Sequence, residues 1–115
     1  MTLPQINSTR PFLTDGGLET TLVYVDGIDL PDFAAFPLLD SEEGRAALRR
    51  YYGPYLDLAE QHAVGFVVDT PTWRASLDWG ARLGYDAIRL ADSNRRAVEF
   101  VTALADERPG LQRVV

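Results

Sequence analysis

The sequence contains no cysteine and no lysine, and it carries few positive charges. Without cysteine, a disulfide framework, a thiolate metal site and a cysteine nucleophile are all excluded for this chain. The eleven basic residues, all arginine, are outnumbered by seventeen acidic residues, so the formal net charge is −6. Duplex nucleic acid and anionic membrane surfaces are therefore not expected as partners, because both bind clustered cations.

Long apolar runs are also missing from the sequence. No stretch approaches the ~20 apolar residues that span a bilayer, and residues 1–10 lack the basic and then apolar pattern of a signal peptide. The composition, 46% hydrophobic and 24% charged, is typical of a globular domain. We therefore expect a soluble cytoplasmic protein, with residues 1–10 as a loosely held lead-in and residues 11–115 as the folded part.

Two short apolar segments that end in polar residues are predicted to be strands. Phe12–Thr14 continues into Asp15-Gly16-Gly17, and Gly65–Thr70 continues into Pro71-Thr72-Trp73. In α/β enzymes a carboxylate at the end of a strand, followed by glycine backbone that a ligand can approach, is a usual place for a small polar substrate. An acid followed by two glycines is also an ordinary turn after a strand.

The segment between the two predicted strands has the apolar spacing of a long helix, which we expect to end near residues 62–65. Asp40 is predicted to cap its first amides, with Glu43 completing a capping box. Pro54 lies inside the apolar pattern. Because proline has no amide hydrogen and crowds the preceding turn, a kink or a break is expected there.

Two further helices and a strand are predicted after residue 70. A short helix covers Arg74–Leu83, and Asp92-Ser93-Asn94 is predicted to cap the helix that carries the apolar stripe from Ala97 to Ala105. Leu111–Val115 has the pattern of a third strand. This alternation of strands and helices predicts a parallel sheet with right-handed connections. The edges of so small a sheet would be open, which could allow self-association.

Two motifs resemble the N-terminal part of the homocysteine S-methyltransferase family. They are Thr14-Asp15-Gly16-Gly17-Leu18-Glu19-Thr20 and Thr70-Pro71-Thr72-Trp73-Arg74-Ala75-Ser76, with a similar segment, Tyr55–Gly65, between them. The resemblance implies part of a (β/α)8 TIM barrel, which typically has ~250 residues. This chain would supply the first two βα units and the start of strand three. It would then be an N-terminal fragment of a transferase that methylates the homocysteine thiol to give methionine.

The resemblance also implies roles for five residues in binding the substrate. Asp15 matches the acid that faces the amino group of homocysteine, and Gly16 and Gly17 match the backbone that meets its carboxylate. Thr72 matches a hydroxyl near the same amino acid, and Glu19 matches the common acid of the first motif, without an assigned role. The second motif departs from the family's pattern at Pro71, Trp73 and Arg74. The methyl donor is therefore not identified.

The family's zinc ion is held by three cysteines late in its chain. Because this sequence has none, no metal, cofactor or catalytic residue is assigned to it, and zinc is expected only in a longer parent. Whether this chain alone is an enzyme stays open. The alternatives are a non-catalytic small α/β domain that binds a ligand or partner, and a structural piece that completes itself by oligomerising.

Other residues of chemical interest have a structural and a functional interpretation. Asp15 with Asp69 could hold Mg²⁺, although acids at strand ends are common. His62, the only histidine, is interpreted as a favourable residue at a helix C-terminus. The aromatic residues Trp73, Trp79 and Tyr85 could pack together, or could form a cage for a methylated cation.

Overall fold

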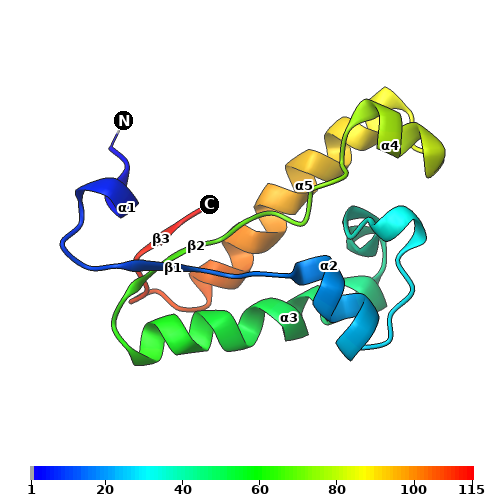
Figure 1. The fold of residues 1–115 in the computed structure, drawn as a ribbon. Helices are drawn as coiled ribbons and strands as arrows, with labels where there is room; N and C mark the ends of the chain where they lie inside the picture. The colour runs from blue at the N-terminus through cyan, green and yellow to red at the C-terminus, as the bar shows by residue number, and fades with distance from the viewer. Residues whose placement is uncertain (1) are drawn as a thin grey trace.

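Three short parallel strands lie at the centre of the computed structural model, which describes residues 2–115 (Figure 1). They are β1 (Phe12–Thr14), β2 (Gly65–Val67) and β3 (Arg113–Val114). The strand order is β1-β2-β3, and Leu13 of β1 lies opposite Phe66 of β2. All three predicted strands therefore form, and the prediction that they are parallel is confirmed.

Helices make up most of the remaining chain. In residues 2–115 they are α1 (Pro4–Asn7), α2 (Leu18–Thr20) with the π-helical turn η1 (Thr21–Val25), the 3-10 turns η2 (Pro31–Phe33) and η3 (Phe36–Asp40), α3 (Glu42–Gln61), α4 (Leu77–Arg82) and α5 (Ala87–Asp106). The predicted lead-in thus contains one short helix. Among the described residues, no helix is both long enough and apolar enough to cross a bilayer.

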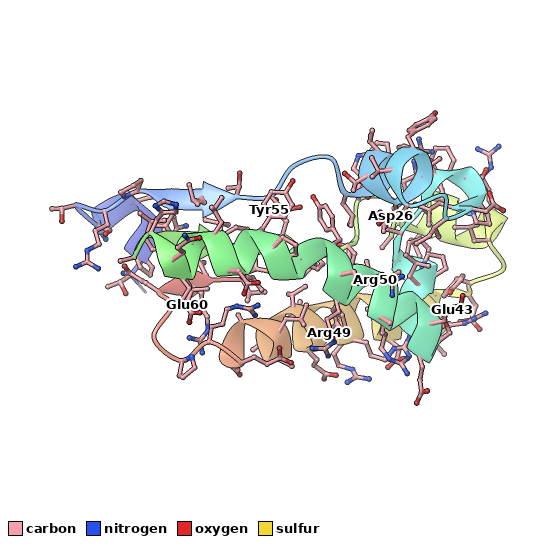
Figure 2. The ribbon with its side chains drawn as sticks, turned by 90° about the horizontal axis from the view of Figure 1, so that it is seen from below. Asp26, Glu43, Arg49, Arg50, Tyr55 and Glu60 are labelled. Carbon is pink, nitrogen blue, oxygen red and sulfur yellow. The ribbon has the colours of Figure 1, made fainter. Side chains whose placement is uncertain are left out.

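The two long helices, α3 and α5, lie on the same side of the sheet (Figures 1 and 2). Both fill connections between neighbouring parallel strands, and crossovers of one hand place such helices on one face. The core lies between this face and the helices, around the fully buried Phe66 of β2, Leu48 and Leu56 of α3, and Val101 of α5. Burying each of these side chains contributes roughly 1.5–3 kcal/mol.

The predicted fold class, part of a TIM barrel, is wrong. Within residues 2–115 the strands have three, three and two residues and form a small sheet in a mostly helical α/β domain. A barrel is defined by closure of a tilted sheet, whereas this sheet has two edges, β1 and β3. The alternation of strands and helices predicts a parallel sheet with its helices, but it does not predict whether that sheet closes.

The long helix begins one residue later than predicted, and Asp40 does not cap it. Ser41 is the N-cap, and its side chain accepts a hydrogen bond from the amide of Gly44 at 2.9 Å. Asp40 instead accepts hydrogen bonds from Tyr85 and from the guanidinium groups of Arg89 and Arg96. It therefore joins η3 to the first part of α5.

The predicted cap at residues 92–94 is also wrong, because those residues lie inside α5. The helix starts at Ala87, where the side chain of Asp86 accepts a hydrogen bond of 2.7 Å from the amide of Arg89. Two acids six residues apart both suit an N-cap. The first is used because Leu90, which precedes the predicted cap, is already buried on the inner face of α5.

Helix α3 does not break at Pro54 but continues from Glu42 to Gln61. The residue before proline is usually forced away from helical angles by its own Cβ. Gly53 has no Cβ, so this restriction is removed. At the other end of the helix, a Cβ on Gly44 would lie 2.1 Å from the carbonyl oxygen of Leu38. Glycine at this position allows η3 to pack directly on the backbone of α3.

Figure 2 shows how the sides of α3 differ. Tyr55 lies on the side that faces the segment after β1, and Arg49 lies on the side that faces α5. The guanidinium of Arg49 forms an ion pair of 2.6 Å with Glu107, just after α5. Both side chains are more than half exposed, so this pair contributes little to stability. The side of α3 that carries Tyr55 therefore faces the segment after β1, where the candidate site described below lies.

Candidate functional site

A pocket of about 400 Å³ lies at the carboxyl ends of β1 and β2. Because parallel strands end at the same edge of a sheet, the residues that follow them meet there. All five residues predicted to bind substrate line this pocket. The full lining is Asp15, Gly16, Gly17, Leu18, Glu19, Tyr52, Asp69, Thr70, Thr72 and Trp73.

One carboxylate oxygen of Asp15 accepts a hydrogen bond within residues 2–115, and the other does not. Its Oδ2 accepts a hydrogen bond of 2.8 Å from the hydroxyl of Tyr51. Its Oδ1 is buried and has no hydrogen-bond partner within residues 2–115. A buried oxygen without a donor is unfavourable, because it has lost water and gained nothing in exchange. Asp15 lines the pocket, and Oδ1 is the oxygen of its carboxylate that lacks a donor.

Three tyrosines of α3 hold the ends of both strands. The Tyr51 hydroxyl also lies 2.9 Å from the carbonyl oxygen of Gly16, and the Tyr55 hydroxyl donates to the same oxygen at 3.2 Å. Tyr52 donates a hydrogen bond of 2.7 Å to the carbonyl oxygen of Asp69. One helix thus fixes the segment after β1 and the segment after β2.

The sequence analysis does not identify these tyrosines as site residues, because their spacing fits the apolar face of the predicted long helix. A usable signal was present. Three tyrosines occur within five residues, and a buried tyrosine hydroxyl usually needs a hydrogen-bond partner. The nearest polar groups available to a helix that packs on a sheet are the residues at the strand ends.

The electrostatics of the pocket are set by carboxylates. Burial raises the pKa of Asp15 above its ordinary value, the Tyr51 hydrogen bond lowers it, and the negative charge of Asp69 raises it. Glu19 also lines the pocket, and no arginine or histidine is among the described lining residues. An ionised Asp15 beside Asp69 is therefore better satisfied by a positively charged group than by water alone.

The tyrosine hydroxyls are held in their protonated form. Burial raises the pKa of Tyr51 far above its ordinary value, and the hydrogen bond and charge of Asp15 raise it further. Burial is also the main cause that raises the pKa of Tyr52, followed by the charge of Asp15. Both side chains are consequently donors at neutral pH, so they stabilise acceptors and do not act as bases.

The two glycines leave the backbone of the pocket open. Gly17 has φ +71°, a left-handed conformation that side chains disfavour, and it is the N-cap of α2. A Cβ on Gly16 would meet nothing within 4 Å, so the space beside its backbone is free. Ligand atoms can therefore approach this part of the main chain closely.

The hydroxyl of Thr72 is paired within the chain. Its Oγ1 lies 2.6 Å from Oγ1 of Thr70, and its amide donates to the carbonyl oxygen of Thr70 at 2.9 Å. Either hydroxyl can be the donor, so the pair keeps one hydroxyl proton and several lone pairs for other partners. Thr72 therefore lines the pocket with a hydroxyl that already takes part in a local hydrogen bond.

The aromatic residues considered as a cation cage do not share one cavity. The guanidinium of Arg74 lies between two indoles, with its carbon 4.4 Å from the ring centre of Trp73 and 3.8 Å from that of Trp79. Tyr85 packs against Phe36 instead, with ring centres 5.0 Å apart. The cation held by the two tryptophans is thus an arginine of this chain.

The residues present do not fit the zinc site of the resembled family. The chain has no cysteine, and no three His, Asp or Glu side chains gather into a ligand set in the part of the chain that the structure describes. Asp15 and Asp69, the two carboxylates of the Mg²⁺ alternative, both line the pocket. His62 is the C-cap residue of α3 and is exposed, in agreement with its structural interpretation.

Comparisons with known proteins add no further information on the site. No protein-family model, no curated protein and no solved structure matches this chain. The resemblance to homocysteine S-methyltransferases therefore depends on the two sequence motifs and on the residues that they bring to the pocket.

Proposed function

We propose that the pocket binds homocysteine by its amino group and serves as the methyl-acceptor site of a cytoplasmic S-methyltransferase. The observation that carries this proposal is the buried Oδ1 of Asp15, which lacks a donor within residues 2–115. An ammonium group supplies both the missing hydrogen bond and the missing positive charge. Charge-assisted hydrogen bonds of this kind are among the strongest in proteins.

The remaining lining suits the rest of an amino acid. The open backbone at Gly16 and Gly17 offers amide groups to a carboxylate, and the hydroxyl pair of Thr70 and Thr72 offers one further polar contact. The volume, about 400 Å³, falls within the ~300–1,000 Å³ that is usual for small-molecule pockets. The role of this chain in the proposed reaction is to bind and orient the acceptor. Activation of the thiol is assigned to none of its residues.

A non-catalytic amine-binding domain is the second candidate. It is favoured by the absence of a basic side chain among the described lining residues, since an amino acid also brings a carboxylate. Asp15, Glu19 and Asp69 would repel that carboxylate unless backbone amides offset the repulsion. A simple amine would avoid this conflict.

Calorimetric titration with three thiols distinguishes the two candidates. L-homocysteine carries both charged groups, mercaptopropylamine lacks the carboxylate, and mercaptobutyrate lacks the amine. The proposal expects the tightest binding for homocysteine and no binding for mercaptobutyrate. Equal affinity for homocysteine and mercaptopropylamine would favour the amine-binding domain. Absence of binding by every amine, in a sample shown to be folded by circular dichroism, would contradict both.

A further inference from the structure

We propose that Tyr51 is a positioning residue for Asp15: its hydroxyl holds one oxygen of this pocket carboxylate and favours the ionised form that binds an ammonium group. The assignment of the ligand depends on the function proposed above. The hydrogen bond between Tyr51 and Asp15 is independent of that proposed function. Tyr51 contacts no ligand in this scheme and acts only through Asp15.

The Tyr51 hydroxyl has a single proton to donate. Two acceptors lie within reach, Oδ2 of Asp15 at 2.8 Å and the carbonyl oxygen of Gly16 at 2.9 Å. Tyr55 also donates to that carbonyl, at 3.2 Å. Because Gly16 has a second donor, the proton of Tyr51 is available for the carboxylate. The charged acceptor also gives the stronger bond.

The side chain of Tyr51 is held firmly by its neighbours. Tyr51 is only 5% exposed, and its ring packs against the rings of Tyr52 and Tyr55, with centres 5.2 and 5.3 Å away. A buried ring in contact with two other rings has little freedom to move its hydroxyl. This hydroxyl holds Oδ2 of Asp15, and Oδ1 is the oxygen left without a donor within residues 2–115.

The charged and polar groups around Asp15 act on its pKa. Asp15 is bonded to Tyr51 of α3 and shares the pocket lining with Tyr52 of α3, Glu19 of α2 and Asp69 after β2. Tyr55 of α3 reaches the neighbouring carbonyl oxygen of Gly16. Burial and the charge of Asp69 raise the pKa of Asp15, and the Tyr51 hydrogen bond is the largest effect that lowers it. Removing the hydroxyl should therefore raise this pKa and extend the neutral form of Asp15 to higher pH.

The experiment is a carbon NMR titration of the Asp15 carboxyl group in the wild-type protein and in two variants. Tyr51→Phe should raise the pKa of Asp15, whereas the matched control Tyr85→Phe, which removes a tyrosine hydroxyl bonded to a different carboxylate, Asp40, outside the pocket, should leave it in place. Equal pKa values in the wild type and Tyr51→Phe would overturn the proposal. An equal rise in both variants would overturn it as well.

Binding supplies the second measurement. Tyr51→Phe should weaken homocysteine binding most at low pH, where more of Asp15 is neutral than in the wild type, and should move the acidic limb of the affinity profile to higher pH. If homocysteine does not bind the wild type but the pKa of Asp15 moves as expected, the proposed function fails and the pairing stands. Tyr51→Phe with wild-type affinity and an unmoved pH profile contradicts the positioning role.

A third measurement covers the case in which Tyr51→Phe does not fold. The buried hydroxyl proton of Tyr51 should give a resolved, slowly exchanging proton signal in the wild type. That signal should shift or be lost in Asp15→Asn. A Tyr51 hydroxyl proton that exchanges freely in the wild type, or that is unaffected by Asp15→Asn, would overturn the proposal without the phenylalanine variant.

Discussion

Asp15→Asn should weaken ligand binding while stabilising the fold. Asparagine keeps an oxygen that can accept the Tyr51 hydrogen bond, but it loses the charge and places an amide nitrogen where Oδ1 stands. A hydrogen bond between an ammonium group and a carboxylate contributes about 1.5–3 kcal/mol. Because Asp15 is only half-buried, the lower end applies, which corresponds to a loss of roughly tenfold in affinity for homocysteine.

The effect on stability has the opposite sign. Burial, the largest cause, raises the pKa of Asp15 in the folded protein above its unfolded value. For a carboxyl group of this kind, the folded state is favoured below the unfolded pKa, and this stabilisation is lost as the pH rises through the folded pKa. At neutral pH the ionised Asp15 therefore destabilises the fold. Asparagine removes this effect, so the variant should melt at a higher temperature than the wild type.

The assay combines calorimetric titration with thermal unfolding, at neutral pH and at a pH below the unfolded pKa of aspartate. The difference in melting temperature should be present at neutral pH and should disappear in acid, where both side chains are uncharged. Asp26→Asn is the matched control, since it removes one negative charge from an exposed turn outside the pocket. Unchanged affinity in Asp15→Asn would refute the reasoning. A joint loss of affinity and stability would also refute it, because it would indicate damage to the fold.

Two further predictions concern the packing around η3. Gly44→Ala should destabilise the fold by ~1–3 kcal/mol, because its Cβ would overlap the backbone of Leu38. Denaturant unfolding measures this loss, and Gly110→Ala, whose Cβ would meet nothing within 4 Å, is the neutral control. Asp40→Asn should lower the pKa of Tyr85 only part of the way from about 12, because burial is its largest cause and the Asp40 hydrogen bond the second. Tyrosinate absorbance during an alkaline titration measures this pKa, and an unchanged value would contradict the pairing.

The sequence was sufficient to predict the strands and their arrangement. Phe12–Thr14 and the segment that begins at Gly65 are short apolar runs between residues that end strands. The connection between them is long and contains a helix, which favours parallel pairing. The same information could not predict whether the sheet closes. Parallel strands joined by helices occur in open sheets and in barrels alike, and only the family resemblance favoured the barrel.

The helix starts were harder to predict because several side chains suit the same role. Asp40, Ser41, Asp86 and Asp92 can all accept a hydrogen bond from a helix amide. Tertiary contacts decide among them. Asp40 is used by Arg89 and Arg96, which lie far away in sequence, so the adjacent Ser41 becomes the cap. No local pattern contains that information.

The location of the pocket was predictable even though the overall fold was not, and the tyrosines of α3 explain the difference. Tyr51 and Tyr55 fix the segment after β1, and Tyr52 fixes the segment after β2, all through contacts within one strand–helix–strand unit. The meeting of Asp15 and Thr72 at one pocket depends on this unit alone, not on how many further strands follow it. A motif that identifies the strand ends can therefore place these residues together correctly and still imply the wrong architecture for the whole sheet.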